Sequence, residues 1–310
     1  MEKIETFEDL ISYSDSSGKK ICKICEEAEA EHFEIPVSKV REKVKNHLDA
    51  MKNAINIGLE SKEKSASGLC GEDCEKLKAH YEHGTTLFSK TYQKVLLYAL
   101  ATIEQNLRMG KIVACPTAGS CGIVPAVIIA LSEAINAPEE EQINALLTAG
   151  MIGEIVSHKV ALAGAVAGCQ GECGGAAAMA AGALVELYGG SSSQVVNAAA
   201  LTLKNIMGLV CDPVAGLVEV PCVKRNAFLA INAVTAAELA MAGVKSVIPA
   251  DEVVDAMRQV GQLMSPHLKE SSEAGLAVTK TGLEISERLS KQWGWRRLKV
   301  YALPINLRNS

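Results

Sequence analysis

Aromatic side chains are scarce in this chain of 310 residues: Phe, Trp and Tyr together make up 4%, although 48% of the residues are hydrophobic. A chain of this length can bury a sizeable core. That core must be built from Ala, Val, Leu and Ile, and an Ala-rich, aromatic-poor core favours closely packed helices over sheets. The sequence also has no long strand pattern and no internal repeat. We therefore predict an all-α fold.

Other absences narrow the function. The start MEKIETFEDL is acidic rather than basic and then apolar, and no run of about 18 apolar residues follows, so we expect neither a signal peptide nor a membrane span. A net charge of −5 offers no basic surface for nucleic acid. The glycines between positions 164 and 175 follow no strand, so they do not form a dinucleotide fingerprint. No lysine is paired with a phosphate-cradling glycine loop, which disfavours a pyridoxal-phosphate enzyme.

Cysteine, in contrast, is plentiful: there are ten. Without a secretory signal they indicate a reducing compartment, the cytoplasm, and thiols that bind metal or act in catalysis. Cys169, Cys211 and Cys222 each stand beside Gly or Pro. A lone cysteine is usually a buried small hydrophobic residue. Backbone that is not committed to regular helix would, however, let three thiolates point at one metal. We expect these three to form one central site in Gly/Pro-containing loops.

Three strings in this part of the chain carry a family resemblance. They are GCQGE at Gly168–Glu172, LVCDPVAGLVEVPCVKRNA at Leu209–Ala227 and PTAGSCG at Pro116–Gly122. They resemble the alpha chain of the iron–sulfur-dependent L-serine dehydratases, also called L-serine ammonia-lyases. Weaker similarity extends from about Ser65 to Thr281.

The resemblance implies a cofactor and a reaction. Cys169, Cys211 and Cys222 match the three cysteines that hold a [4Fe–4S] cluster in that family. The implied activity is deamination of L-serine to pyruvate and ammonia. Because three thiolates leave one iron of the cluster open, that iron would act as a Lewis acid on the leaving hydroxyl.

Two loops and one arginine are candidates for substrate binding. The loop ACPTAGSCG, residues 114–122, presents backbone N–H groups and hydroxyls suited to a carboxylate, and its candidate contacts are Thr117, Gly119 and Ser120. Arg225 could bind the same carboxylate bidentately, or be a surface arginine at a helix start.

Ser67 and Gly68 match a family loop of the type S/T-G-L-x-G-G-D, which lies near the substrate. Glu72 replaces the second glycine of that loop here, so a polar helix-entry loop is an equal alternative.

The sequence does not identify the catalytic base. It contains six histidines, none of which lies in a family motif. In the family, a serine-rich motif ending in His-Thr lies in the beta portion, which this chain lacks. The resemblance therefore implies a beta-subunit partner, with L-serine as substrate.

Three alternatives remain open. A cluster protein for electron transfer or redox sensing is one, although ferredoxin ligands lie closer together in sequence. A zinc-stabilised helical protein could use Cys22, Cys25, Cys70 and Cys74. A related lyase could degrade cysteine or threonine. We interpret Cys115 and Cys121 as packing residues. Cys173, one helical turn after Cys169, is not a family ligand.

Charged residues are unevenly distributed: residues 1–100 carry 33 of them and residues 110–240 only 15. This shift separates a solvated N-terminal part from a buried central part. We divide the chain into an N-terminal charged helical segment (1–36), a serine dehydratase alpha-type catalytic domain (37–290) and a C-terminal tail (291–310).

Helices are predicted by periodicity and caps. Apolar residues recur every three to four positions after Pro36, which predicts an amphipathic helix that ends at Gly58. Residues 265–281 are expected to be a loop. The other predicted helices are 85–108, 123–135, 139–156, 191–207, 224–242 and one from 249 onward.

Overall fold

A computed structural model describes residues 4–294, and in this range it is helical, with an isolated bridge between Cys211 and Lys269 but no strand. The prediction of an all-α fold is confirmed. The helices are α1 (Phe7–Ser17), α2 (Ile21–His32), α3 (Val37–Glu60), α4 (Asp73–His83), α5 (Lys90–Leu107), α6 (Ile123–Ala134), α7 (Glu139–Ser157), α8 (Gly164–Ala167), α9 (Cys169–Leu187), α10 (Ser192–Ile206), α11 (Cys222–Met241), α12 (Ala250–Leu263) and α13 (Lys280–Trp293). Short 3-10 helices are η1 (Ala118–Ser120), η2 (Val214–Gly216), η3 (Pro266–Leu268) and η4 (Gly275–Val278).

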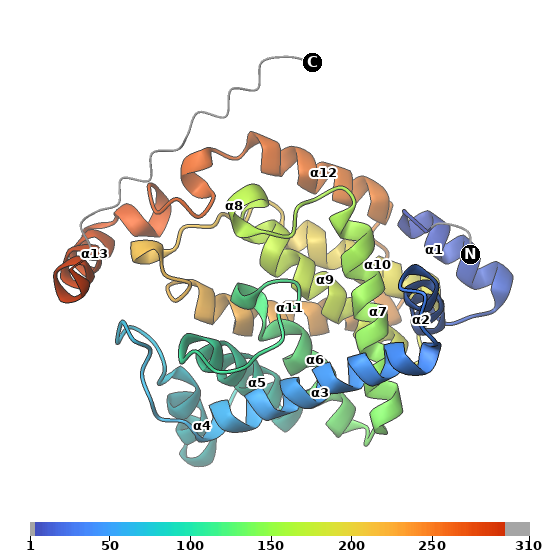
Figure 1. The fold of residues 1–310 in the computed structure, drawn as a ribbon, viewed down its shortest axis with the longest axis horizontal. Coiled ribbons are helices and arrows are strands. Elements are labelled where there is room, and N and C mark those ends of the chain that lie inside the picture. Colours follow the sequence, from blue (N-terminus) through green and yellow to red (C-terminus); the bar gives the residue numbers. More distant parts are fainter. Residues whose placement is uncertain (1–3, 295–310) are drawn as a thin grey trace.

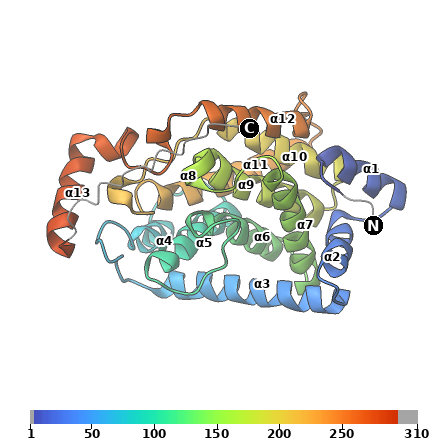
Figure 2. The same ribbon diagram turned by 45° about the horizontal axis from the view of Figure 1, so that its top comes forward.

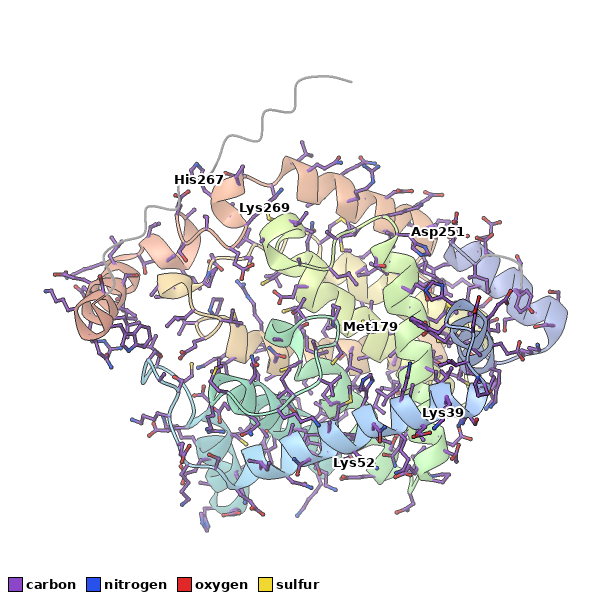
Figure 3. All side chains as sticks on the ribbon, viewed as in Figure 1. Lys39, Lys52, Met179, Asp251, His267 and Lys269 are labelled. Carbon is purple, nitrogen blue, oxygen red and sulfur yellow. The ribbon has the colours of Figure 1, made fainter. Side chains whose placement is uncertain are left out.

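Helix α9 is the centre of the fold. It is buried on nearly every side, by α7, α10, α11 and α6. Its glycines allow this close packing: a Cβ on Gly171 would lie 2.7 Å from the carbonyl oxygen of Ala161, and one on Gly182 would lie 2.2 Å from Cδ1 of Ile152. Both ribbon views show α3 along one side of the molecule and α12 along the opposite side (Figures 1 and 2). Met179 of α9 lies between them (Figure 3).

Helix α3 starts as predicted but ends later. Pro36 is its N-cap, and the helix continues through Gly58 to Glu60. A Cβ on Gly58 would lie 2.2 Å from the carbonyl oxygen of Ala101 in α5. This glycine therefore allows two helices to touch, and its prediction as a helix end was wrong.

The other predicted helices are confirmed with shifts of one or two residues at their ends, except that α5 begins at Lys90, five residues later than predicted. Pro138 is the N-cap of α7, and Ser191 forms a capping box with Gln194 at the start of α10. Helix α11 begins at Cys222, two residues earlier than predicted. No helix range was predicted for α4, α8, α9 or α13, and η3 and η4 lie in the segment expected to be a loop.

The N-terminal segment packs into the same hydrophobic core as the centre of the chain, through Phe7, Leu10 and Ile21. Glu186 of α9 accepts hydrogen bonds from the backbone N–H groups of Ile21 and Cys22. The proposed division into domains stays a prediction, and residues 295–310 of the tail lie outside the described residues.

None of the described helices is long and apolar enough to cross a membrane.

Candidate metal centre

Cys169, Cys211 and Cys222, together called the thiol centre, are all buried. Cys211 lies in the loop between α10 and η2, as predicted. Cys169 and Cys222 instead are the first residues of α9 and α11, because Gly168 and Pro221 act as N-caps rather than as loop residues. The prediction of loop positions was wrong for these two. A helix N-terminus carries a partial positive charge, which stabilises a thiolate.

The structure brings two of these thiols together with a carboxylate. The sulfurs of Cys169 and Cys211 and a carboxylate oxygen of Glu172 all lie within 4.8 Å of one another. Cys222 is outside this group, although its electrostatic effect reaches the thiols of Cys211 and Cys173. A four-iron cluster binds each thiolate at a different iron, so its ligands can be farther apart than those of a single ion. The donor set therefore fits such a cluster.

The pKa values of the thiols in and next to the thiol centre are shifted in opposite directions. The pKa of Cys169 is lowered to about 3, because the thiols of Cys173 and Cys211 donate toward its sulfur and Arg225 adds positive charge. Those same contacts, together with burial, raise the pKa values of Cys173 and Cys211. Burial raises the pKa of Cys222. The centre thus favours one thiolate among neutral thiols, and binding a cationic cluster would release protons.

Helix α8 borders the thiol centre at a glycine. A Cβ on Gly164 would lie 2.9 Å from the sulfur of Cys211 and 3.0 Å from Oε2 of Glu172. Oε2 of Glu270 would be 3.4 Å from the same point. The absence of a side chain at Gly164 leaves room beside the donor atoms, which also fits a bulky group at this place.

The side chain of Arg225 is hydrogen-bonded within the thiol centre and to its neighbours. Its Nη1 donates to the sulfur of Cys169 at 3.3 Å and to the carbonyl oxygen of Val210 at 2.9 Å. Its Nη2 donates to Oδ1 of Asp212 at 2.9 Å. The side chain of Arg225 is only 15% exposed, so it is not the surface arginine of the alternative interpretation. Its contact with a substrate carboxylate stays a prediction.

A segment after α12, the covering loop (residues 265–279), lies against Cys211. The N–H of Cys211 donates to the carbonyl oxygen of Leu268 at 2.8 Å, and the N–H of Glu270 donates to the carbonyl oxygen of Cys211 at 2.7 Å. Oδ2 of Asp212 accepts the N–H of Leu276 at 2.9 Å. Figure 3 shows where this loop begins, at His267 and Lys269 beyond the end of α12.

The 114–122 loop reaches the thiol centre through Glu172. The hydroxyl of Thr117 donates to Oε1 of Glu172 and lies 3.2 Å from the hydroxyl of Ser120. A Cβ on Gly119 would lie 2.5 Å from the same carboxylate oxygen. Burial raises the pKa of Glu172 to about 6. Thr117, Gly119 and Ser120 therefore lie close to Glu172, which follows Cys169 by three positions.

Asn226 of α11 fixes the shape of the 114–122 loop. It accepts the N–H of Gly122 at 2.9 Å and donates to the carbonyl oxygen of Gly119 at 2.8 Å. This buried amide links the loop to the helix that starts at Cys222.

Ser67 and Gly68 lie in a second loop, residues 65–70. The hydroxyls of Ser65 and Ser67 both donate to Oε2 of Glu219, each at 2.7 Å. Gly68 has a φ of +73°, which favours glycine at this turn. Glu72, which replaces the second glycine of the family loop, forms ion pairs with Lys64 and Lys76.

The cysteines of the zinc alternative do not come together. Cys22 and Cys25 lie on α2, whereas Cys74 is the second residue of α4, and its sulfur donates to the carbonyl oxygen of Leu97 at 3.7 Å. Among the described residues, the group able to hold a metal ion is that of Cys169, Glu172 and Cys211. Cys115 and Cys121 are buried and contact backbone carbonyls, which agrees with their interpretation as packing residues.

Several residues around the thiol centre were missed by sequence reasoning. Glu172, Asp212, Glu219 and Asn226 all lie inside the strings that carry the resemblance, so polar residues in those strings were the available signal. Glu270 lies outside them and had no signal.

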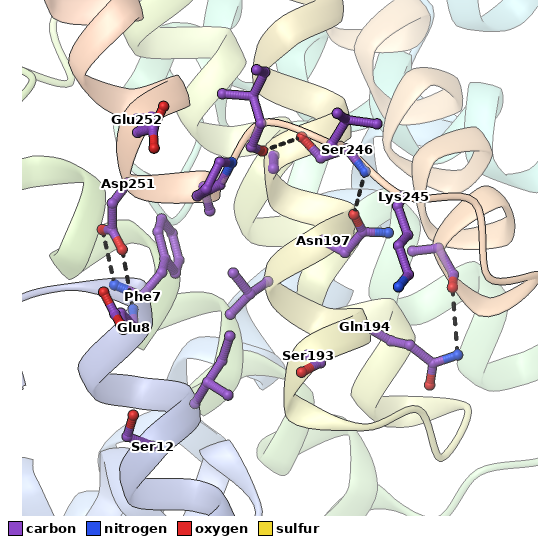
Figure 4. Close-up of a pocket in the computed structure, with 18 of the residues that line it drawn as sticks. Phe7, Glu8, Ser12, Ser193, Gln194, Asn197, Lys245, Ser246, Asp251 and Glu252 are labelled. Carbon is purple, nitrogen blue, oxygen red and sulfur yellow. Dashed lines mark hydrogen bonds between the residues drawn. The ribbon is translucent and has the colours of Figure 1, made fainter.

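Two cavities lie elsewhere. One, of about 780 Å³, is formed by α1, α10 and α12, where Asp251 accepts the N–H groups of Phe7 and Glu8 and the amide of Asn197 accepts the N–H of Ser246 (Figure 4). The other, of about 680 Å³, lies between α2, α3 and α7, and Cys115 and Pro116 line it. Neither is lined by the thiol centre.

The sequence is similar to known proteins over most of its length. The family model described as serine dehydratase alpha chain matches residues 16–277, a range that includes Cys169, Cys211 and Cys222. The chain is 48% identical over 244 residues to a probable L-serine dehydratase alpha chain of Bacillus subtilis, covering 79% of this chain and 81% of that one. It is 38% identical over 289 residues to the L-serine dehydratase alpha chain of Peptoniphilus asaccharolyticus, covering 93% and 99%.

A longer protein, the L-serine dehydratase TdcG of Escherichia coli, is 43% identical over 185 residues. This match covers 59% of the present chain but 40% of TdcG.

Proposed function

The chain belongs to the serine dehydratase alpha chain family, and we propose that it is the alpha chain of an iron–sulfur-dependent L-serine ammonia-lyase. The observation that carries the proposal is the meeting of Cys169, Cys211 and Glu172 within 4.8 Å, beside the 114–122 loop. The relatives are named L-serine dehydratases, and their reaction would convert L-serine to pyruvate and ammonia.

Cys169, Cys211 and Cys222 would hold a [4Fe–4S] cluster. When bound, the cluster would supply a Lewis acid for the departing hydroxyl group, through an iron that has no protein thiolate. Arg225 balances part of the negative charge of the thiolates, since its guanidinium already lies against Cys169. Gln170 holds the start of α9 in place, because its side chain accepts the N–H of Gly208 at 2.8 Å and donates to the carbonyl oxygen of Met257 at 3.0 Å.

Thr117, Gly119 and Ser120 would bind the substrate carboxylate, with the positive charge of Arg225 nearby. This assignment is supported by the small, polar residues of the 114–122 loop, which Asn226 holds next to the thiol centre through two hydrogen bonds. Ser67 and Gly68 would line the same site from the 65–70 loop. A fixed arrangement of these groups would orient the Cα–H and Cβ–O bonds that break in dehydration.

A second chain would complete the enzyme. The two relatives that are matched over 81% and 99% of their length are named alpha chains, whereas TdcG is a longer chain of which the present one matches 40%. His158 lies 3.2 Å from the backbone carbonyl oxygen of Glu5, and His267 lies 2.8 Å from Oε2 of Glu273, both at exposed positions, so these contacts do not involve a residue of the thiol centre. We propose that a beta subunit supplies the base that removes the Cα proton, and that the complex works in the cytoplasm.

Anaerobic reconstitution tests the proposal. The chain is loaded with iron and sulfide, with and without a beta chain, and supplied with L-serine, L-threonine or L-cysteine. We expect four irons per chain, and pyruvate from L-serine when the beta chain is present. A loaded complex that is reversibly reduced but yields no pyruvate would support the electron-transfer alternative, and one zinc per chain would support the zinc alternative. Faster release of ammonia from L-threonine or L-cysteine would assign the related lyase activity.

A further inference from the structure

Glu219 is a buried carboxylate without a cationic partner. It is 6% exposed, and its Oε2 accepts hydrogen bonds from Ser65 and Ser67, both at 2.7 Å. Both donors are neutral hydroxyls. Among residues 4–294, no Lys, Arg or His nitrogen lies within 4.0 Å of this carboxylate. Burying an ionised carboxylate is costly unless a positive group compensates it.

Two cationic side chains that contact the 65–70 loop have other partners. Lys224 binds Asp73 at 2.6 Å, and Arg288 donates to the carbonyl oxygen of Ser67 at 3.5 Å. The N-terminus of α11 contributes some positive potential, since the carbonyl oxygen of Glu219 accepts the N–H of Val223. A helix terminus is equivalent to about half an elementary charge, so part of the carboxylate charge is left uncompensated.

Glu219 lies in a segment that is next to both loops proposed to bind the substrate. It precedes Cys222 by three residues, and the 65–70 loop is hydrogen-bonded to it. Cγ1 of its neighbour Val218 lies 3.1 Å from where a Cβ on Gly119 would be, which places this segment against the 114–122 loop. A carboxylate-binding loop on one side and a buried carboxylate on the other match the two charges of a free amino acid.

Building on the proposed function, we propose that Glu219 binds the ammonium group of the amino-acid substrate. An ammonium group has three N–H donors and a full positive charge, which the two serine hydroxyls cannot supply. Ser65 and Ser67 are positioning residues that orient the carboxylate of Glu219. The interaction would make the enzyme select 2-amino acids over acids of the same shape that lack the amino group.

The test uses the loaded complex with its beta chain and compares wild type with Glu219→Gln, which keeps the hydrogen-bond acceptor but removes the charge. KM and kcat are measured for L-serine, and the inhibition constant is measured for 3-hydroxypropionate, which is serine without its ammonium group. We expect KM for L-serine to rise on the order of 10- to 100-fold, since a charge-assisted hydrogen bond is lost. The inhibition constant of 3-hydroxypropionate should change less than about twofold, because this acid has no ammonium group that could interact with Glu219.

Controls separate binding from folding. Glu72→Gln removes a surface carboxylate next to the 65–70 loop and should leave both constants unchanged. Cluster absorbance and far-UV circular dichroism should be the same in all three proteins. If Glu219→Gln does not fold, Ser67→Ala gives the second measurement, and it should raise KM for L-serine more than the inhibition constant of 3-hydroxypropionate.

Three results would overturn the inference while leaving the proposed function standing. Equal weakening of both ligands would assign Glu219 a structural role. An unchanged KM would show that it does not bind substrate. A potassium requirement that is lost in Glu219→Gln, with selectivity unchanged, would make the occupant a metal cation. Absence of L-serine turnover by the loaded wild-type complex would overturn the proposed function and this inference together, whereas turnover with unchanged selectivity overturns this inference alone.

Discussion

Nη1 of Arg225 lies 3.3 Å from the sulfur of Cys169, and the same guanidinium binds Asp212 through Nη2. One side chain thus joins the start of α9 to the loop that carries Cys211. Asp212 in turn binds the N–H of Leu276 in the covering loop. Arg225 therefore connects three segments that are far apart in sequence.

Replacing Arg225 with Ala should destabilise the chain as well as weaken cluster binding. Asp212 would remain buried without its cation, and loss of one partner of a buried ion pair costs about 3 kcal/mol or more. The measurement is urea unfolding of the cluster-free chain. Arg258→Ala is the control, because its pair with Asp255 is exposed and should matter by less than about 0.5 kcal/mol. Similar losses in the two variants would contradict the bridging role of Arg225.

The choice among the ten cysteines can be tested by serine substitution. Cys169→Ser, Cys211→Ser and Cys222→Ser should each lose cluster absorbance and lyase activity, because a hydroxyl is a poor ligand for iron. Cys25→Ser and Cys173→Ser should keep the cluster. If Cys173→Ser lost the cluster while Cys211→Ser kept it, the ligand pair would be Cys169 and Cys173 instead.

A single methyl group at Gly164 should impair cluster loading. In Gly164→Ala, the new Cβ would lie 2.9 Å from the sulfur of Cys211 and 3.0 Å from Glu172. We expect the iron content after reconstitution to fall at least several-fold, while far-UV circular dichroism is unchanged. Gly150→Ala on α7 is the matched control, because nothing lies within 4 Å of its new methyl group. Helix propensity alone should make that control about 0.5–1 kcal/mol more stable. Equal iron contents in the two variants would show that α8 does not border the cluster.

Oxygen should inactivate the loaded enzyme. An iron that lacks a protein thiolate is open to substrate, and therefore also to oxidants that can remove it. Activity and iron content are followed together during aeration, and both should decline. Activity that survives prolonged aeration unchanged would argue against an open iron.

Local signals predicted the helices well. Pro36, Pro138 and Ser191 act within one turn of the helix that they start, so their effect can be recognised without the fold. Gly58 misled the prediction because its role depends on contact with Ala101, which is distant in sequence.

The candidate site was predictable only in part. The strings around Cys169, Cys211 and Cys222 pointed to the thiols, but a glycine or proline beside a cysteine fits a loop and a helix N-cap equally well. Glu270 could not be found, because it reaches Cys211 only through the covering loop that follows α12.

The covering loop has a consequence for biosynthesis. Residues 265–279 contact Cys211 and Asp212 and are translated after all the cysteines of the chain. While the ribosome still holds this segment, the side of the thiol centre that it covers is open to solvent. The proposed cluster would therefore enter most readily from this side before the covering loop packs against Cys211, and a nascent chain depends on the cell to keep its thiols reduced until then.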